Sequence, residues 1–182
     1  MKFLKTAIED VIIVEPEIYG DDRGFFLETY QARLFKQNGI PHEFVQDNHS
    51  GSNQGALRGL HYQLKQTQGK LLRAIAGEIF DVAVDIRRSS PNFGQWVGTT
   101  LSSQNKHQLW VPPGFAQGFY VLSQWAEVVY KVTDYYAPGW DRTILWNDPQ
   151  IGIQWPLLEG RPPILSKKDA NGLLLAQADV FD

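Results

Sequence analysis

The chain has 182 residues, with 17 basic and 20 acidic side chains and no cysteine. The net charge of −3, without any basic run, argues against general nucleic-acid binding, which needs clustered lysine and arginine. The missing cysteines exclude disulfides, thiolate metal sites and cysteine nucleophiles, and no apolar run approaches the roughly 20 residues of a membrane span.

The N-terminal segment contains a strand signal and a turn. Glu9 and Asp10 come too early for the core of a signal peptide, so we expect a cytoplasmic protein. Val11–Val14 is a short β-branched run. Asp21–Gly24 is a turn, after which Phe25–Leu27 resumes an extended pattern.

One early helix is indicated over Gln31–Asn38. We expect Thr29 to be its N-cap, because a threonine hydroxyl can accept from a free N–H of the first turn. Gly39 stands where a helix of this length would end.

From residue 57 onward the chain consists mostly of short strand signals separated by turns. Glu78–Ile86 alternates, with Phe80, Val82, Val84 and Ile86 on one face and Ile79, Asp81, Ala83 and Asp85 on the other. Further strands are predicted at Gln95–Leu101, Gln108–Val111, Phe119–Leu122, Glu127–Thr133 and Thr143–Trp146. Turn signals at Pro112–Gly114 and Ala137–Gly139 separate several of them. Such strands predict an antiparallel sandwich or barrel, in one domain over residues 1–182.

The segment Leu57–Gln63 is the most informative one. If the strand is unbroken, Gly59, His61 and Gln63 share one face, because residues i and i+2 of a strand point the same way. A histidine there could move protons inside a barrel mouth. It could equally be a hydrogen-bonded histidine in a half-buried sheet, and the segment alone leaves both readings open.

Five further residues could take part in proton chemistry or anion binding, and each has a plain structural alternative. Tyr130 is either a core residue between two valines or a weak acid in a pocket. Lys70 is either a solvated lysine or the partner of an oxyanion. Asp169 is the third helical residue of a predicted capping box that begins at Ser166. Arg23 and Arg58 each adjoin a glycine and either face solvent or bind phosphate oxygens.

Metal ligation is not favoured by the spacing. The four histidines are scattered, without a His-x-His or His-Glu-x-x-His pair. There is also no phosphate loop, dinucleotide fingerprint or Gly-x-Ser-x-Gly motif. Composition and spacing therefore leave proton transfer as the main candidate, without assembling the residues into one site.

Taken together, several segments resemble the dTDP-4-dehydrorhamnose 3,5-epimerase family, in order and over nearly the whole chain. The matching stretches are Asp22–Glu28, Val45–Ser50, Leu57–Gln63, Gly69–Leu71, Phe80–Arg87, Pro113–Ala116, Tyr130–Lys131, Trp146–Pro149 and Ser166–Asp169. The resemblance implies a cupin-type jelly roll with a few short helices, usually a homodimer, that works without a metal or organic cofactor. It also implies the substrate dTDP-4-keto-6-deoxyglucose, inverted at C3 and C5 to the 4-keto precursor of dTDP-rhamnose.

The resemblance assigns a role to each matched residue. His61 would be the base, Asp169 its carboxylate partner, Tyr130 the acid on the opposite face of the sugar, and Lys70 the group that stabilises the enolate oxygen. A larger set would hold the nucleotide or the sugar: Arg23, Glu28, Gln46, Asp47, Asn48, Arg58, Gln117, Asp141 and Lys168.

The chain departs from the family's pattern at two of these positions. The family commonly has histidine where this chain has Gln117, and frequently has glutamate at Asp141. Three rival readings follow: a 3-epimerase or ketoisomerase on a related sugar, a non-catalytic sugar-binding jelly roll, and a metal-dependent cupin enzyme. The intact His61, Tyr130 and Lys70 favour the epimerase.

Overall fold

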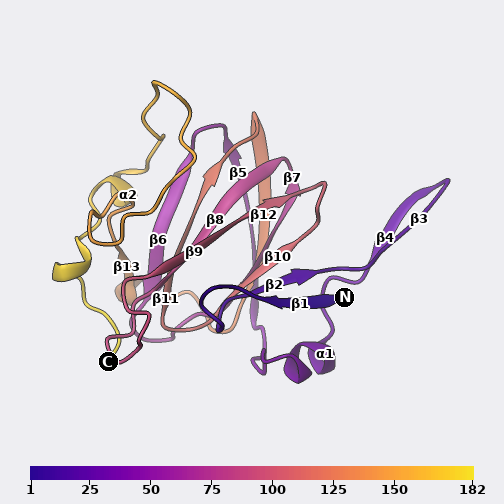
Figure 1. The fold of residues 1–182 in the computed structure, drawn as a ribbon, viewed down its shortest axis with the longest axis horizontal. Helices are drawn as coiled ribbons and strands as arrows, with labels where there is room; N and C mark the ends of the chain where they lie inside the picture. The colour runs from indigo at the N-terminus through magenta and orange to yellow at the C-terminus, as the bar shows by residue number, and fades with distance from the viewer.

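The computed structural model describes all 182 residues and contains two antiparallel sheets packed face to face (Figure 1). The six-stranded sheet has the spatial order β1 (Lys2–Lys5), β2 (Ile12–Glu15), β10 (Gln108–Val111), β7 (Lys70–Ala76), β12 (Trp125–Val132) and β5 (Gln46–Asn53). The five-stranded sheet has the order β13 (Asp141–Thr143), β6 (Leu57–Gln63), β11 (Phe115–Val121), β8 (Glu78–Asp85) and β9 (Trp96–Ser102). The predicted mainly β sandwich is confirmed.

The helical segments are few and short. They are α1 (Ala32–Gln37), α2 (Lys167–Ala170) and the 3₁₀ turns η1 (Pro138–Trp140) and η2 (Leu175–Gln177). No helix of the structure has the length and apolar character needed to cross a membrane.

The main core lies between the two sheets and follows the predicted strand alternation. Ile79 and Ala83 of β8 pack there with Val128 of β12. The other face of β8 carries Val82 and Val84 into a second apolar cluster. Both faces of β8 are buried because the C-terminal segment covers the outside of the five-stranded sheet (Figure 1).

The early helix is confirmed, but its predicted N-cap is wrong. The N-cap is Gln31, and its side chain makes no capping hydrogen bond. Phe35 anchors the helix in a third apolar cluster with Trp110. Packing of this apolar side chain, rather than a cap at Thr29, therefore sets where the helix lies. Gly39 follows the helix with a φ of +89°, a conformation that glycine adopts readily.

Several strands differ from the sequence predictions, and β1, β7 and the strand at residues 18–21 were not predicted at all. β11 begins at Phe115, four residues earlier than predicted, and all seven of its residues are buried, so that alternation does not mark it. β5 was not predicted, because its sequence is almost wholly polar. β13 covers Asp141–Thr143 instead of Thr143–Trp146, and only Thr143 is shared.

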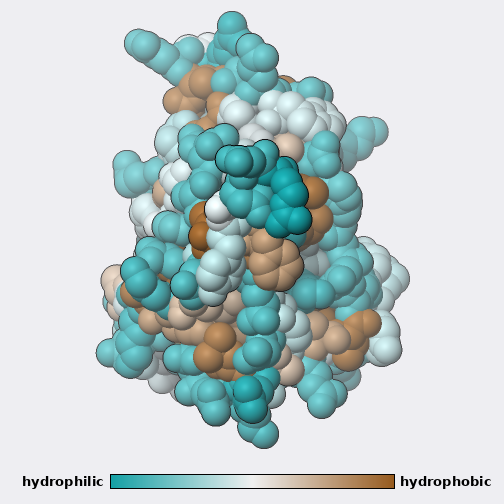
Figure 2. All heavy atoms as spheres, turned by 90° about the vertical axis from the view of Figure 1, so that its right-hand side faces the viewer, coloured by the Kyte–Doolittle hydropathy of each residue, from teal (hydrophilic) through white to brown (hydrophobic).

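A two-stranded hairpin, β3 (Ile18–Asp21) and β4 (Gly24–Leu27), projects from the sandwich (Figure 1). It exposes large apolar side chains: Ile18, Tyr19, Phe25 and Phe26. The face of the molecule from which this hairpin projects shows apolar residues among the polar ones (Figure 2). We call residues 18–28 the arm.

Candidate active site

A polar cavity of about 380 Å³ opens between the two sheets. Nine of the thirteen predicted site residues line it: Gln46, Asn48, Arg58, His61, Lys70, Gln117, Tyr130, Asp141 and Lys168. They come from seven different elements, which only the closed sandwich brings together. The cavity therefore assembles most of the residues that the sequence proposed one by one.

A register shift places Arg58 and His61 on the same wall. β11 pairs Gln117 with His61 but Phe119 with Arg58, so β6 holds one residue more between the two pairs. Residues three apart on a regular strand would point to opposite faces. The irregularity turns both side chains into the cavity.

His61 is paired with a buried carboxylate. Its Nε2 lies 2.5 Å from Oδ1 of Asp169, which is only 3% exposed. An ionised Asp169 accepts the Nε2 proton, and the lone pair of Nδ1 stays available. Burial lowers the pKa of His61, and Lys168 and Lys70 lower it further, against the opposing effect of Asp169. The imidazole is therefore neutral at pH 7 and able to take up a proton.

The short helix α2 positions Asp169, and the predicted N-cap at Ser166 is confirmed, without the reciprocal bond from the Ser166 N–H to the carboxylate that completes a capping box. The backbone N–H of Asp169 donates to Ser166 Oγ at 3.1 Å. Ser166 Oγ–H donates in turn to Asp169 Oδ2 at 2.7 Å, which leaves Oδ1 for His61. Asp169 thus takes part in the helix cap through its backbone N–H and supports the histidine through its carboxylate.

Tyr130 lies on the other sheet, on β12, between the buried Val128 and Val132 as the alternation predicts. Its ring reaches the same cavity as His61. Burial raises the pKa of Tyr130, although Arg58 opposes the shift. The phenol therefore keeps its proton at neutral pH and can donate it.

Lys70 points into the cavity from β7. Its Nζ donates to the carbonyl oxygen of His61 at 3.3 Å and contacts Gln117 Oε1 at 3.5 Å. Burial lowers the pKa of Lys70 to about 8, with Asp81 as the main opposing charge. The ammonium is charged at neutral pH and stands beside the base.

The cavity mouth carries a cluster that was only partly expected. Lys168 and the hydroxyl of Tyr136 both donate to Oδ2 of Asp141, the latter at 3.2 Å. Sequence reasoning missed Tyr136, which lies in a loop without periodicity. It also missed Asp81, whose signal was a carboxylate within the apolar strand Glu78–Ile86.

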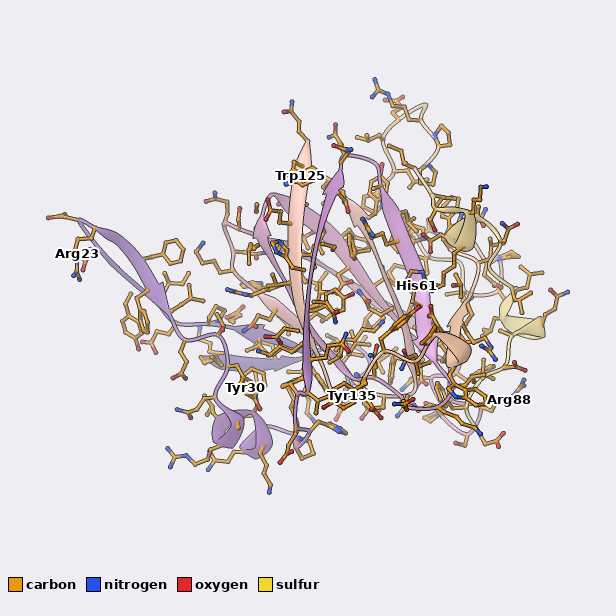
Figure 3. All side chains as sticks on the ribbon, turned by 180° about the vertical axis from the view of Figure 1, so that it is seen from behind. Arg23, Tyr30, His61, Arg88, Trp125 and Tyr135 are labelled. Atoms are coloured by element: carbon orange, nitrogen blue, oxygen red, sulfur yellow. The ribbon has the colours of Figure 1, made fainter.

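Three predicted substrate-binding residues lie elsewhere. Asp47 points to the outer face of the six-stranded sheet, where it pairs with Lys131 at 3.0 Å. Arg23 lies in the arm, and Glu28 directly follows its second strand. Arg23 is far from His61 in the view from behind (Figure 3).

No group of three or more histidine, aspartate or glutamate side chains converges in a way that could hold a metal ion. Outside the cavity, His49 pairs with Glu127 at 3.0 Å, His107 lies 3.7 Å from Glu15, and the ring of His42 lies near Trp110. Only His61 lines the cavity.

A histidine with a carboxylate partner and a phenol on the facing sheet define an enzyme that moves protons to and from a small polar substrate. Residues 5–177 match the family described as dTDP-4-dehydrorhamnose 3,5-epimerase. The chain belongs to this family. The predicted family, the isomerase class and the 3,5-epimerase function on a dTDP sugar are confirmed.

Individual relatives agree with this assignment. A dTDP-4-dehydrorhamnose 3,5-epimerase of Pseudomonas aeruginosa is 58% identical over 100% of this chain and 99% of its own length. The crystal structure of RmlC from Legionella pneumophila in complex with dTDP-4-keto-L-rhamnose superposes with a TM-score of 0.95 at 55% identity, covering 98% of this chain and 94% of that one. ChmJ, a 3′-monoepimerase from Streptomyces bikiniensis in complex with dTDP-quinovose, has a TM-score of 0.87 at 32% identity, covering 94% and 87%. The predicted cupin-type jelly roll agrees with these neighbours.

Proposed function

We propose that the cavity converts dTDP-4-keto-6-deoxyglucose to its C3 and C5 double epimer by two proton exchanges through enolate intermediates. The C4 carbonyl acidifies both neighbouring C–H bonds, because the electron pair released from either carbon moves onto the carbonyl oxygen. His61 takes the proton at Nδ1, and Asp169 stabilises the resulting imidazolium. Lys70 stabilises the enolate oxygen.

Inversion requires that the proton return from the other face of the ring. Tyr130 donates its phenolic proton to the enolate carbon, and the C4 carbonyl is restored. Exchange with solvent then removes the proton from His61 and reprotonates Tyr130 before the second carbon reacts. The two residues belong to different sheets, and a sugar ring between them would have one on each face. This arrangement of His61 and Tyr130 on facing walls is the observation that carries the proposal.

Most of the remaining cavity residues suit a nucleotide sugar. Arg58 and Lys168 supply positive charge for the diphosphate, and Gln46 and Asn48 supply amides. Gln46 Nε2 already donates to Asn48 Oδ1 at 2.8 Å, which orients both side chains. Asp141 holds Lys168 at the mouth.

We further propose that the enzyme is a homodimer in which the arm completes the partner's site. The arm exposes apolar side chains that a second copy would cover. Neither Arg23 nor Glu28 lines the cavity of its own chain, and Arg23 lies far from His61 (Figure 3). An arm exchanged between two copies would bring these residues to a cavity. A cytoplasmic location is proposed as well, since a nucleotide sugar is an intracellular metabolite.

Incubation with dTDP-4-keto-6-deoxyglucose in heavy water, followed by NMR at C3 and C5, tests the proposal. We expect deuterium at both carbons and double inversion, and we expect His61→Asn to abolish both while leaving the fold intact. Exchange without dependence on His61 would contradict the assigned base.

One narrower activity is tested by the same experiment. A 3′-monoepimerase shares this fold, with a TM-score of 0.87, and this chain has glutamine at position 117, where the family commonly has histidine. Deuterium at C3 alone would identify a 3-epimerase. Binding without exchange would leave a sugar-binding protein, and exchange only after added metal would indicate a metal-dependent cupin.

A further inference from the structure

Below the cavity lies a buried carboxylate that the proposed proton transfers do not use. Asp81 is 0% exposed and belongs to β8, a strand between β11 and β9. Its Oδ1 accepts a hydrogen bond from Gln117 Nε2, whereas its Oδ2 has no partner. Burying a carboxylate that lacks hydrogen-bond donors costs free energy. The presence of Asp81 at this buried position therefore needs an explanation.

Gln117 connects this carboxylate to the cavity. In the β11–β8 pairing Gln117 lies opposite Ala83 and Phe119 opposite Asp81, so Gln117 and Asp81 are diagonal neighbours on the same face. The Nε2 of Gln117 donates to Asp81, and its Oε1 faces Lys70 Nζ at 3.5 Å. An amide has one donating and one accepting end, and here each end meets the charge that it complements.

The same glutamine is fixed relative to the base. Its backbone pairs directly with His61 across β6 and β11, and the His61 carbonyl is the other acceptor of Lys70. Lys70 is therefore oriented by the Gln117 amide and the His61 carbonyl. The pairing of β6 with β11 fixes the positions of both groups.

We propose that Asp81 and Gln117 are positioning residues that, by acting through a carboxylate–amide–ammonium relay, keep Lys70 charged and directed at the enolate oxygen. This inference rests on the proposed function, since it assigns Lys70 to the enolate. It also gives Gln117 a role in the relay in place of the predicted direct contact with the substrate. The Gln117 amide does not titrate, so it offers the relay the same donor and the same acceptor at every pH.

The relay has a consequence for the alkaline side of the activity profile. The charged and titratable groups around Lys70 are Asp81 on β8, His61 on β6, Asp141 on β13 and Lys168 on α2, with Tyr130 on the neighbouring strand β12 of the same sheet. Asp81 is the largest opposing influence on the lowered pKa of Lys70. Burial raises the pKa of Asp81 to about 7, and Gln117 opposes this rise through its hydrogen bond, so Asp81 is ionised on the alkaline side, where Lys70 titrates.

The test is a titration of Lys70 by lysine-selective NMR in the free protein, together with kcat against pH. In Asp81→Asn we expect the pKa of Lys70 to fall by about one further unit, because a nearby negative charge is lost. Gln117→Leu should give a similar shift, because Asp81 then loses the donor that keeps it ionised. The double variant should shift no further than either single variant, since both act on the same relay.

In the active enzyme, the alkaline fall of kcat should move to lower pH in both variants with little change in KM. Lys70→Met should remove that fall. Asp85→Asn is the matched control, because Asp85 is a fully buried carboxylate on the same strand that pairs with Arg87 outside the cavity. It should leave the Lys70 titration unchanged.

An unshifted titration in Asp81→Asn, or an equal shift in Asp85→Asn, would overturn the relay. Asp81→Asn keeps the shape of the side chain and carries the test if Gln117→Leu does not fold. The NMR titration requires no turnover, so a failed relay is distinguishable from a failed epimerase, which the heavy-water experiment on the unmodified protein would reveal.

Discussion

The hydroxyl of Ser166 fixes the orientation in which the Asp169 carboxylate faces His61. One oxygen of the carboxylate accepts from the Ser166 hydroxyl at 2.7 Å, while the other lies 2.5 Å from the histidine ring. Both contacts are made by the same planar carboxylate. A substitution at Ser166 should therefore change the support of His61, although Ser166 itself does not contact the histidine.

We expect Asp169→Asn to lower kcat by about 10²- to 10⁴-fold, because an amide cannot stabilise the imidazolium and favours the wrong tautomer. Ser166→Ala should lower kcat by roughly tenfold, because the carboxylate stays but loses its cap and orientation. Steady-state kinetics on both variants provide the measurement. Equal losses would argue that Asp169 matters only through its contacts with Ser166 and not through its charge beside His61.

Tyr130→Phe removes one hydroxyl and keeps the ring between Val128 and Val132. Proton removal by His61 should continue, whereas delivery from the opposite face should fail. We expect formation of the inverted sugar to fall about 10²- to 10⁴-fold and deuterium wash-in to fall much less. If wash-in and inversion declined together, Tyr130 would not be the donor.

The acidic side of the pH profile should report His61. Its pKa is lowered from 6.5, first by burial and then by Lys168 and Lys70. Since the base must be neutral, kcat/KM should hold down to pH 6.5 and fall only below it. His61 contributes stability above pH 6.5, and this contribution is lost as pH falls, because the unfolded chain then binds the proton more readily.

Lys168→Met should raise the pKa of His61, because a positive charge is removed, and should move the acidic fall to higher pH. NMR titration of the imidazole in the free protein measures this directly. The adjacent, exposed Lys167 is the control, and Lys167→Met should leave the titration in place. A lower pKa in Lys168→Met would contradict the assigned electrostatics.

Complementation tests the exchanged arm. His61→Asn and Arg23→Ala should each be nearly inactive as homodimers. After co-refolding in equal amounts, half of the dimers would be mixed and each would hold one intact site, so about a quarter of the full activity should return. No recovery would show that Arg23 serves the cavity of its own chain or none at all.

Gly118 lies where β11 and β6 approach closely. A Cβ there would stand 2.7 Å from the carbonyl oxygen of Arg58 and 3.1 Å from the Cα of Gly59. Gly118→Ala should therefore destabilise the fold by about 1–3 kcal/mol and displace the strand that carries His61. Gly139→Ala meets no atom within 4 Å and should leave the melting temperature unchanged. Thermal unfolding compares the two, and equal melting temperatures would contradict the close approach.

Strand alternation predicted part of this site correctly. It placed Tyr130 with Val128 and Val132, and it placed Asp81 on the face that it shares with Ala83. The family resemblance, rather than any pattern, joined residues as distant as His61 and Asp169, because spacing along one chain does not report which strands become neighbours.

The remaining features depend on tertiary context. The register shift that brings Arg58 beside His61 arises between β6 and β11, and neither strand encodes it alone. β5 was missed because its inner face lines a polar cavity, where hydrophobic alternation has no reason to appear. Alternation within Val45–Ser50 would nevertheless have separated the inward Gln46 and Asn48 from the outward Asp47.

The separation of His61 and Asp169 along the chain has a consequence for protein synthesis. The two residues are 108 positions apart, and Asp169 belongs to a helix that begins only at Lys167. A growing chain therefore leaves the ribosome with its base long before the carboxylate that orients it. Nascent and C-terminally shortened chains carry the histidine, the tyrosine and the lysine but lack the carboxylate partner of the base, so docking of the last segment completes the site.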